Sequence, residues 1–166
     1  ELNEKIQIKE KIDTETDFWN FNAFFELIFR EYKRMKLFNY SMIFVYLTLK
    51  LKKTETNITV LEKFFKLNYA NLIKLFGETL KNNLKSKDNI LIRLDITNFL
   101  IIFANNIKTN IETNILPKIL KELADNIELS PKFEFEYYIT EYSADVSINK
   151  IIDDYMLQNF KMFFKN

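Results

Sequence analysis

Residues 90–103 read ILIRLDITNFLIIF, and this stretch decides how the middle of the chain folds. Residues 90–93 and 99–103 are apolar runs with the length and the β-branched or aromatic content of short strands. The segment between them, residues 95–98, is short enough for a tight turn. We therefore expect an antiparallel hairpin here.

Outward from this hairpin, the spacing of apolar residues predicts strands and helices along the whole chain. Residues 42–50 are aromatic and β-branched, as in a strand buried on both faces. Residues 133–142 alternate apolar and polar side chains, as in a half-exposed strand. Helical spacing is found in residues 20–36, in residues 60–84 with a break near Asn68 that makes two helices, in residues 111–127 with Pro117 in the first turn or at a kink, and in residues 148–164.

Residues 1–12 have apolar side chains at helical spacing among alternating charges, but the segment is too short to be stable alone. We interpret it as the end of a longer helix that enters from upstream, followed by one domain at residues 13–166. The order of elements predicts an α+β single domain in which helices flank a mostly antiparallel sheet.

The composition excludes several classes of chemistry. The 166 residues contain one glycine and neither cysteine nor histidine. The chain therefore has no Ser-His-Asp or Cys-His nucleophile, no thiolate or imidazole for zinc, and too few glycines for a P-loop or a dinucleotide fingerprint. A net charge of +1 gives no reason to expect nucleic acid as a partner. The apolar runs are too short to span a bilayer, so we expect no membrane segment here.

Several short strings resemble the diguanylate cyclase family, which is named for its GGDEF hairpin. Asp13, Thr16 and Asn20 have the spacing of the family's entry string, and Ala23-Phe24 matches its helix-opening Ala-Phe. Further matches are Arg93 and Phe99, which bracket the hairpin, the string Thr140-Glu141-Tyr142 in a late strand, and the end of the last helix at Lys165-Asn166. The resemblance implies a GGDEF-like, nucleotidyl cyclase-like domain with a five-stranded sheet, whose last short strand would follow Asn166.

The sequence departs from the family where the family binds metal. As the resemblance implies, family members join two GTP molecules with magnesium ions held by carboxylates on the first strand and in the hairpin. Here Tyr46 and Thr48 take the strand positions, and Thr97 and Asn98 take the hairpin positions. Because no Asp or Glu lies between Glu31 and Glu55, a shift of register would not restore the carboxylates. Phosphoryl transfer would lose its main electrostatic support, and we expect no metal and no cofactor.

The family's glycines are also replaced. Asp95 and Ile96 stand where two glycines let the family's hairpin approach the phosphates, and they bring like charge and bulk. On the late strand Tyr138 replaces a glycine and Glu136 a serine. Tyr46 and Tyr138 would project where a nucleotide lies, either as core that fills the old pocket or as a surface for a partner. The degenerate hairpin thus comprises Asp95, Ile96, Thr97, Asn98 and Phe99.

Other candidate sites have a plain structural interpretation beside the functional one. Lys85-Ser86-Lys87-Asp88 resembles the family's inhibitory Arg-x-x-Asp, and Lys85 and Asp88 could be its remnant. Lysine lacks the bidentate fork of arginine, so we favour a polar loop. Asp153-Asp154 would point about 100° apart on a helix, which favours a solvated face over a metal cage.

These patterns predict a catalytically inactive GGDEF-like domain that acts as a regulatory, dimerisation or protein-interaction module in bacterial signal transduction. Its partner would be another protein, or a second copy held through the upstream helix, and its location would be cytoplasmic. The alternative is a non-catalytic receptor for GTP or cyclic di-GMP. A third hypothesis is an enzyme of another chemistry that uses lysine, tyrosine and carboxylates.

Overall fold

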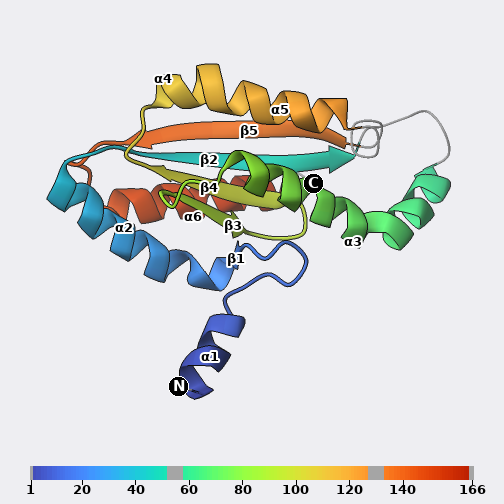
Figure 1. The fold of residues 1–166 in the computed structure, drawn as a ribbon, viewed down its shortest axis with the longest axis horizontal. Coiled ribbons are helices and arrows are strands. Elements are labelled where there is room, and N and C mark those ends of the chain that lie inside the picture. The colour runs from blue at the N-terminus through green and yellow to red at the C-terminus, as the bar shows by residue number, and fades with distance from the viewer. Residues whose placement is uncertain (1, 52–57, 127–132, 165–166) are drawn as a thin grey trace.

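The fold is shown in Figure 1 as a computed structural model, which describes residues 2–51, 58–126 and 133–164. The strands are β1 (Trp19–Asn20), β2 (Met42–Leu51), β3 (Asn89–Arg93), β4 (Asn98–Ala104) and β5 (Phe133–Tyr142). They form a five-stranded sheet in the order β1-β3-β4-β2-β5. The pairing is antiparallel except between β1 and β3, which are parallel. The predicted hairpin is confirmed, with Ile92 of β3 opposite Leu100 of β4.

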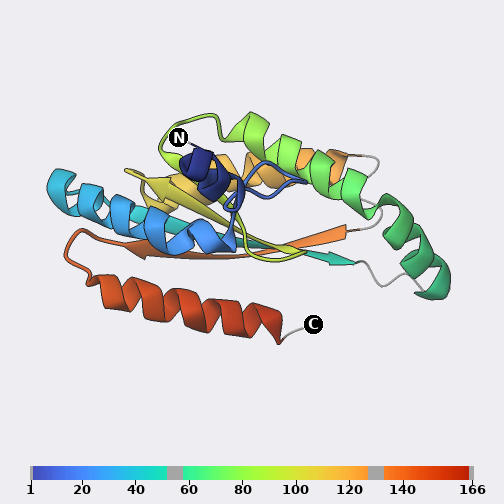
Figure 2. The same cartoon turned by 90° about the horizontal axis from the view of Figure 1, so that it is seen from below.

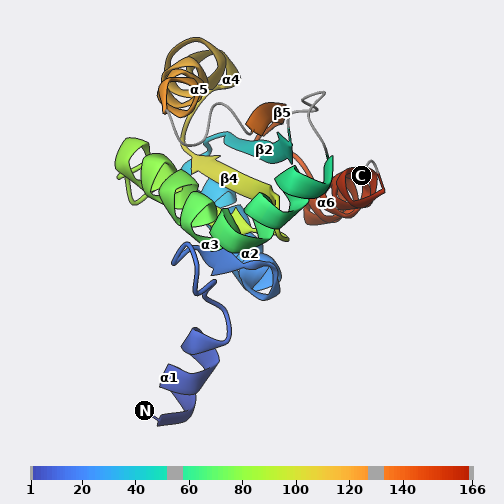
Figure 3. The same ribbon diagram turned by 90° about the vertical axis from the view of Figure 1, so that its right-hand side faces the viewer.

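Helices cover both faces of the sheet. Figure 2 shows α2 and α6 on one side, and α3 and α5 on the other. Helix α1 projects from the rest of the domain (Figure 3). None of the helices in the described residues is long and apolar enough to cross a membrane. The bounds are α1 (Leu2–Lys9), the 3-10 turn η1 (Phe21–Ala23), α2 (Phe24–Phe38), α3 (Ile58–Asn83), α4 (Lys108–Asn110), the π-helical turn η2 (Ile111–Ile115), α5 (Leu116–Asp125) and α6 (Ile148–Phe163).

Strand β2 supplies side chains to both layers of the core. Ile43, Val45 and Leu47 pack on the side of α3 and α5, whereas Phe44 and Tyr46 pack on the side of α2 and α6. All five are buried, so the predicted strand with two covered faces is confirmed. On the second side, the rings of Phe24 from α2 and Tyr155 from α6 stack with their centroids 3.5 Å apart.

The structure corrects two expectations from the sequence. Helix α3 is one continuous helix with no break at Asn68, because a change in the spacing of apolar residues does not by itself interrupt the backbone hydrogen bonds of a helix. The helix expected at residues 111–127 is divided, with a π-helical turn before α5, and Pro117 lies in the first turn of α5. The described residues also contain one strand that was not predicted, β1, whose two residues are too few to give an alternating pattern.

Backbone geometry places the single glycine and the tight turns. Gly77 is buried in α3, and a Cβ there would lie 3.2 Å from the Cβ of Thr16, so glycine allows the close approach of the entry loop. Asp17, Asn39 and Asn105 have left-handed backbone angles, with φ of 59°, 53° and 53°. Asn39 ends α2 and donates its N–H to the carbonyl of Met35.

Candidate functional site

The turn between β3 and β4 satisfies its own hydrogen-bond donors. One carboxylate oxygen of Asp95 accepts the backbone N–H groups of Thr97 and Asn98, each at 2.9 Å. The other oxygen accepts the side-chain amide of Asn98 at 2.7 Å. Ile96 projects into solvent and is 64% exposed, whereas Phe99 is buried in the core. The N–H groups of Thr97 and Asn98 therefore donate to a negatively charged side chain of the same turn.

A buried arginine connects this turn to the entry loop. Arg93 is 7% exposed, and its guanidinium binds both carboxylate oxygens of Asp13 at 3.0 and 3.1 Å. It also reaches Glu15 at 3.0 Å and donates to the carbonyls of Asp95 and Ile96. The carboxylate of Asp13 in addition accepts the backbone N–H and the hydroxyl of Thr16. This network fixes the position of the hairpin relative to the start of the domain.

The predicted strand positions lie beside the hairpin. Thr48 is opposite Asn98 in the register of β2 and β4, and its hydroxyl donates to the side-chain oxygen of Asn98 at 2.7 Å. Thr97 lies in the turn, where its carbonyl accepts the N–H of Leu49 at 2.9 Å. The structure therefore brings Thr48 and Asn98 together as an uncharged, hydrogen-bonded pair.

Tyr46 is two residues before Thr48 and on the same face of β2. It is opposite Tyr138 of β5, and the two ring centroids are 6.3 Å apart. Tyr46 is 2% exposed and Tyr138 is 52% exposed. The buried Tyr46 hydroxyl has no hydrogen-bond partner among the described residues. Burial, with smaller contributions from Tyr142 and Tyr155, raises the pKa of this hydroxyl far above its usual value, so it stays protonated.

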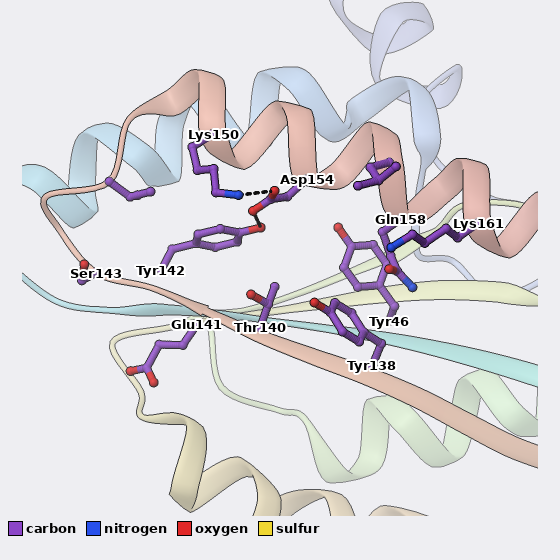
Figure 4. A pocket seen from close by; sticks show the side chains of 12 residues that line it. Tyr46, Tyr138, Thr140, Glu141, Tyr142, Ser143, Lys150, Asp154, Gln158 and Lys161 are labelled. Atoms are coloured by element: carbon purple, nitrogen blue, oxygen red, sulfur yellow. Dashed lines mark hydrogen bonds and ion pairs between the residues drawn. The ribbon is translucent and has the colours of Figure 1, made fainter.

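A cleft runs between this face of the sheet and α6 (Figure 4). It has two adjoining hollows of about 390 and 290 Å³, which share Tyr46, Tyr138, Gln158 and Lys161 as lining residues. In Figure 4 the side chains of Gln158 and Lys161 point from α6 toward the ring of Tyr46. The size falls within or near the range of small-molecule sites, about 300–1,000 Å³.

Charges around the cleft are mostly paired with one another. The ammonium group of Lys150 lies 2.7 Å from Asp154, whose other oxygen accepts the hydroxyl of Tyr142 at 3.0 Å. Burial and the neighbouring Asp154 raise the pKa of Tyr142. On the other hollow, the ammonium of Lys50 lies 2.7 Å from Glu136. Among the described residues, Lys161 has no carboxylate within ion-pair distance.

Comparison with solved structures identifies the fold. The GGDEF domain of FimX from Pseudomonas aeruginosa matches with a TM-score of 0.69 and 13% identity over 87% of each chain. This chain has the fold of a GGDEF domain. The coiled coil and GGDEF domain of DgcB from Caulobacter crescentus, solved in complex with c-di-GMP, gives a TM-score of 0.72 at 12% identity, with 92% of this chain and 80% of that chain covered.

A third GGDEF-fold neighbour is the diguanylate cyclase SiaD from Pseudomonas aeruginosa, solved in complex with its activator SiaC. It matches with a TM-score of 0.69 at 12% identity, over 98% of this chain and 63% of that chain. No protein-family model and no curated protein sequence match this chain. At identities this low, the structural matches establish the GGDEF-like fold only. The function has to be argued from the site.

Of the other sequence candidates, only Asp154 lines the cleft. Lys85 and Asp88 lie exposed in the loop between α3 and β3, where Asp88 is 3.8 Å from the guanidinium of Arg34. Asp153 is exposed, while Asp154 turns toward the cleft, so the two adjacent carboxylates point apart as expected. Within the described ranges, no three Asp or Glu side chains are grouped closely enough to hold a metal ion.

Sequence reasoning missed the side of the cleft that α6 forms. Lys150, Asp154, Gln158 and Lys161 were not predicted as site residues, although Asp154 was considered as half of a carboxylate pair. Their spacing of three to four residues puts them on one face of α6 and is the signal that could have found them.

Proposed function

We propose that this GGDEF-like domain is a catalytically inactive regulatory module in bacterial signal transduction that uses cyclic di-GMP. The main support is the Asp95 carboxylate, which accepts the backbone N–H groups of Thr97 and Asn98. The resemblance implies that the family's hairpin approaches nucleotide phosphates at these positions. A carboxylate there repels a phosphate and occupies the donors that a phosphate would use.

The neutral pair on β2 supports the same proposal. Tyr46 and Thr48 stand where the family has metal-binding carboxylates, and the Thr48 hydroxyl is hydrogen-bonded to Asn98. Magnesium is bound mainly through carboxylates and substrate phosphates, and phosphoryl transfer needs its positive charge. These two side chains contribute no negative charge that would hold the ions.

The wider setting of the module follows from the resemblance. Residues 1–12 would be the end of an incoming signalling helix, and residues 13–166 the domain that it controls. A protein partner, or a second copy held through that helix, would receive the signal in the cytoplasm. The SiaD–SiaC complex is an instance of a GGDEF-fold cyclase solved with a protein activator.

A turnover assay tests the loss of catalysis. The chain is incubated with GTP and either magnesium or manganese, and cyclic di-GMP is measured by mass spectrometry beside an active cyclase of the same fold. We expect no product above the blank without protein. Steady formation of cyclic di-GMP would overturn the proposal.

The cleft favours a second candidate, a non-catalytic receptor for GTP or cyclic di-GMP. Its specific support is the buried Tyr46 hydroxyl, which has no hydrogen-bond partner in the described part of the chain, in a cleft that Lys161 also lines. Calorimetric titration with each nucleotide separates the two candidates. A receptor would release heat at micromolar concentration and lose affinity in Lys161→Gln but not in Lys33→Gln, an exposed control on α2. Absence of heat with both nucleotides supports the regulatory module alone.

A further inference from the structure

Helix α6 has a second apolar stripe that the described fold leaves in solvent. Its buried side packs Ile151 and Tyr155 into the core. A separate set of apolar side chains follows the spacing i, i+4, i+7 and i+8, which places them on one face of the helix. These are Met156, Phe160 and Phe163 of α6 and the residue that caps its C-terminus, Phe164, which are 56%, 60%, 68% and 68% exposed.

The neighbouring helix α2, with the η1 turn before it, has a matching stripe. Phe21, Phe25 and Phe29 are spaced four residues apart and are 58%, 44% and 45% exposed. Helices α2 and α6 lie on the same side of the sheet (Figure 2), and the ring of Phe25 meets that of Tyr155 edge-on with centroids 6.3 Å apart.

The two stripes form one surface. Phe21 and Phe163 line the same hollow, which has a volume of about 300 Å³. We call the combined surface the aromatic face; it consists of Phe21, Phe25, Phe29, Met156, Phe160, Phe163 and Phe164.

The aromatic face is larger than a monomer usually exposes. A fully exposed aromatic side chain offers roughly 150–250 Å², so these side chains at their observed exposures offer about 100 Å² each and about 700 Å² together. The largest apolar patch on a typical monomer is about 300–600 Å². A stable protein interface buries about 800 Å² on each partner. The area therefore suits a complete interface rather than an incidental patch.

We propose that the aromatic face is buried against the same face of a second copy of this chain, in a two-fold symmetric dimer. Its seven defining side chains are six phenylalanines and one methionine, as in the apolar core of a homodimer interface, and Asp95 and Asn159 also line the hollow between the two stripes. Two-fold homodimers are also the commonest closed assemblies. Two helices from each copy would meet as a four-helix layer between the sheets.

This dimer goes beyond the proposed regulatory function and does not depend on it. The polar residues of α6 that line the cleft, Lys150, Asp154, Gln158 and Lys161, are on a different side of the helix from the stripe. The dimer thus leaves the cleft open, and it uses no contact from α1.

Sedimentation velocity over a concentration series tests the proposal on the whole chain. We expect a dimer that dissociates in Phe25→Glu and in Phe160→Glu, with a more than tenfold rise in the dissociation constant. The control is Ile107→Glu, because Ile107 is 60% exposed just before α4 and outside the aromatic face. A chain that stays monomeric throughout, or a dimer unaffected by both phenylalanine variants, would overturn the proposal. A folded circular-dichroism spectrum of each variant is required.

A second measurement locates the interface without adding charge. Because the chain has no cysteine, Phe160→Cys and Ile107→Cys each give one spin-label site per copy. Pulsed electron resonance should show a shorter distance between labels in the dimer at position 160 than at position 107. A dimer with the reverse order is formed by another surface, such as α1, and refutes the aromatic face. Neither outcome changes the result expected in the GTP turnover assay. A failure of the proposed dimer can therefore be distinguished from a failure of the proposed function.

Discussion

Asp95 is a turn residue whose carboxylate accepts hydrogen bonds from the backbone next to it. It accepts three donors, two from the main chain of Thr97 and Asn98 and one from the Asn98 amide. Buried or partly buried donors cost stability when they lose their acceptor. The carboxylate of Asp95, on which the proposed loss of phosphate binding rests, therefore also stabilises the hairpin.

Replacing Asp95 by alanine should destabilise the domain by about 2 kcal/mol, because the turn donors lose their acceptor. Urea unfolding followed by circular dichroism measures the change. Asp153→Ala is the control, since Asp153 is exposed on α6, and it should stay within about 0.5 kcal/mol of the parent. Equal stability of Asp95→Ala and the parent would show that water replaces the carboxylate at no cost.

For Tyr46 we predict no loss of stability when its hydroxyl is removed, because this hydroxyl is buried without a partner among the described residues. A buried polar group without a hydrogen bond costs about 1–3 kcal/mol, so Tyr46→Phe should be as stable as the parent or more stable by about 1 kcal/mol at pH 7. Denaturant unfolding measures it. A clear loss of stability would indicate a bound water or ligand on this hydroxyl.

The pH dependence of stability follows from the same group. Burial raises the pKa of Tyr46, so the folded state holds the proton more tightly than the unfolded chain, in which tyrosine has a pKa of about 10. The stabilisation is complete below pH 10 and is lost as the pH rises above it. Urea midpoints between pH 8 and 11 should fall more steeply for the parent than for Tyr46→Phe. Parallel curves would contradict this assignment.

At the scale of elements, helix α3 and the entry loop meet at Gly77 and Thr16. The Cβ that a larger residue would add at position 77 lies 3.2 Å from both the Cβ and the Cγ2 of Thr16. Alanine is the better helix former by about 1 kcal/mol, but only where the neighbour leaves room. The helix thus gives up intrinsic stability for a close contact with the loop.

A double-mutant cycle measures that contact. Thr16→Ser keeps the hydroxyl that binds Asp13 and removes the Cγ2 methyl group. Gly77→Ala should therefore be more favourable in the Thr16→Ser background than in the parent, by about 1 kcal/mol. Free energies of unfolding of the four proteins give the coupling. If the changes in the free energy of unfolding are additive, the loop moves away from position 77 at no cost.

The sequence predicted most helices and strands, because each is long enough for its apolar residues to repeat several times at helical or strand spacing. Strand β1 was not predicted, because two residues are too few to show an alternating pattern. The π-helical turn η2 was not predicted either, because the one residue that it adds to a helical turn leaves no recognisable sequence pattern. The pairing of Thr48 with Asn98 depends on the register between β2 and β4, which the spacing of apolar residues does not specify. That the Tyr46 hydroxyl has no partner among the residues described could not be predicted, because it depends on the positions of the α6 side chains around it.

On the scale of the whole molecule, one sheet separates two apolar layers. Successive residues of β2 and β4 point into opposite layers, so Phe44 lies on the side of α2 and Phe103 on the side of α3. A layer cannot lose its helices without exposing strands that also support the other layer. The described fold is therefore one cooperative unit despite its two cores.

Unfolding should accordingly follow a single transition. The only tryptophan, Trp19, packs against the layer of α2 and α6, whereas far-ultraviolet circular dichroism also reports α3 and α5. Both signals should give the same urea midpoint, in the parent and in Phe44→Ala and Phe103→Ala, each destabilised by about 3–5 kcal/mol. Separate midpoints would show that the layers unfold independently.

The left-handed turns also affect the chain before it folds. Asp17, Asn39 and Asn105 occupy backbone angles that most proteins give to glycine. Because asparagine and aspartate have fewer accessible conformations than glycine, the unfolded chain loses less freedom when these turns form. Asn39→Ala should cost about 1 kcal/mol through backbone strain, and Asn39→Gly close to nothing, as thermal unfolding can measure. A chain nearly without glycine thus begins to fold from a narrower set of conformations.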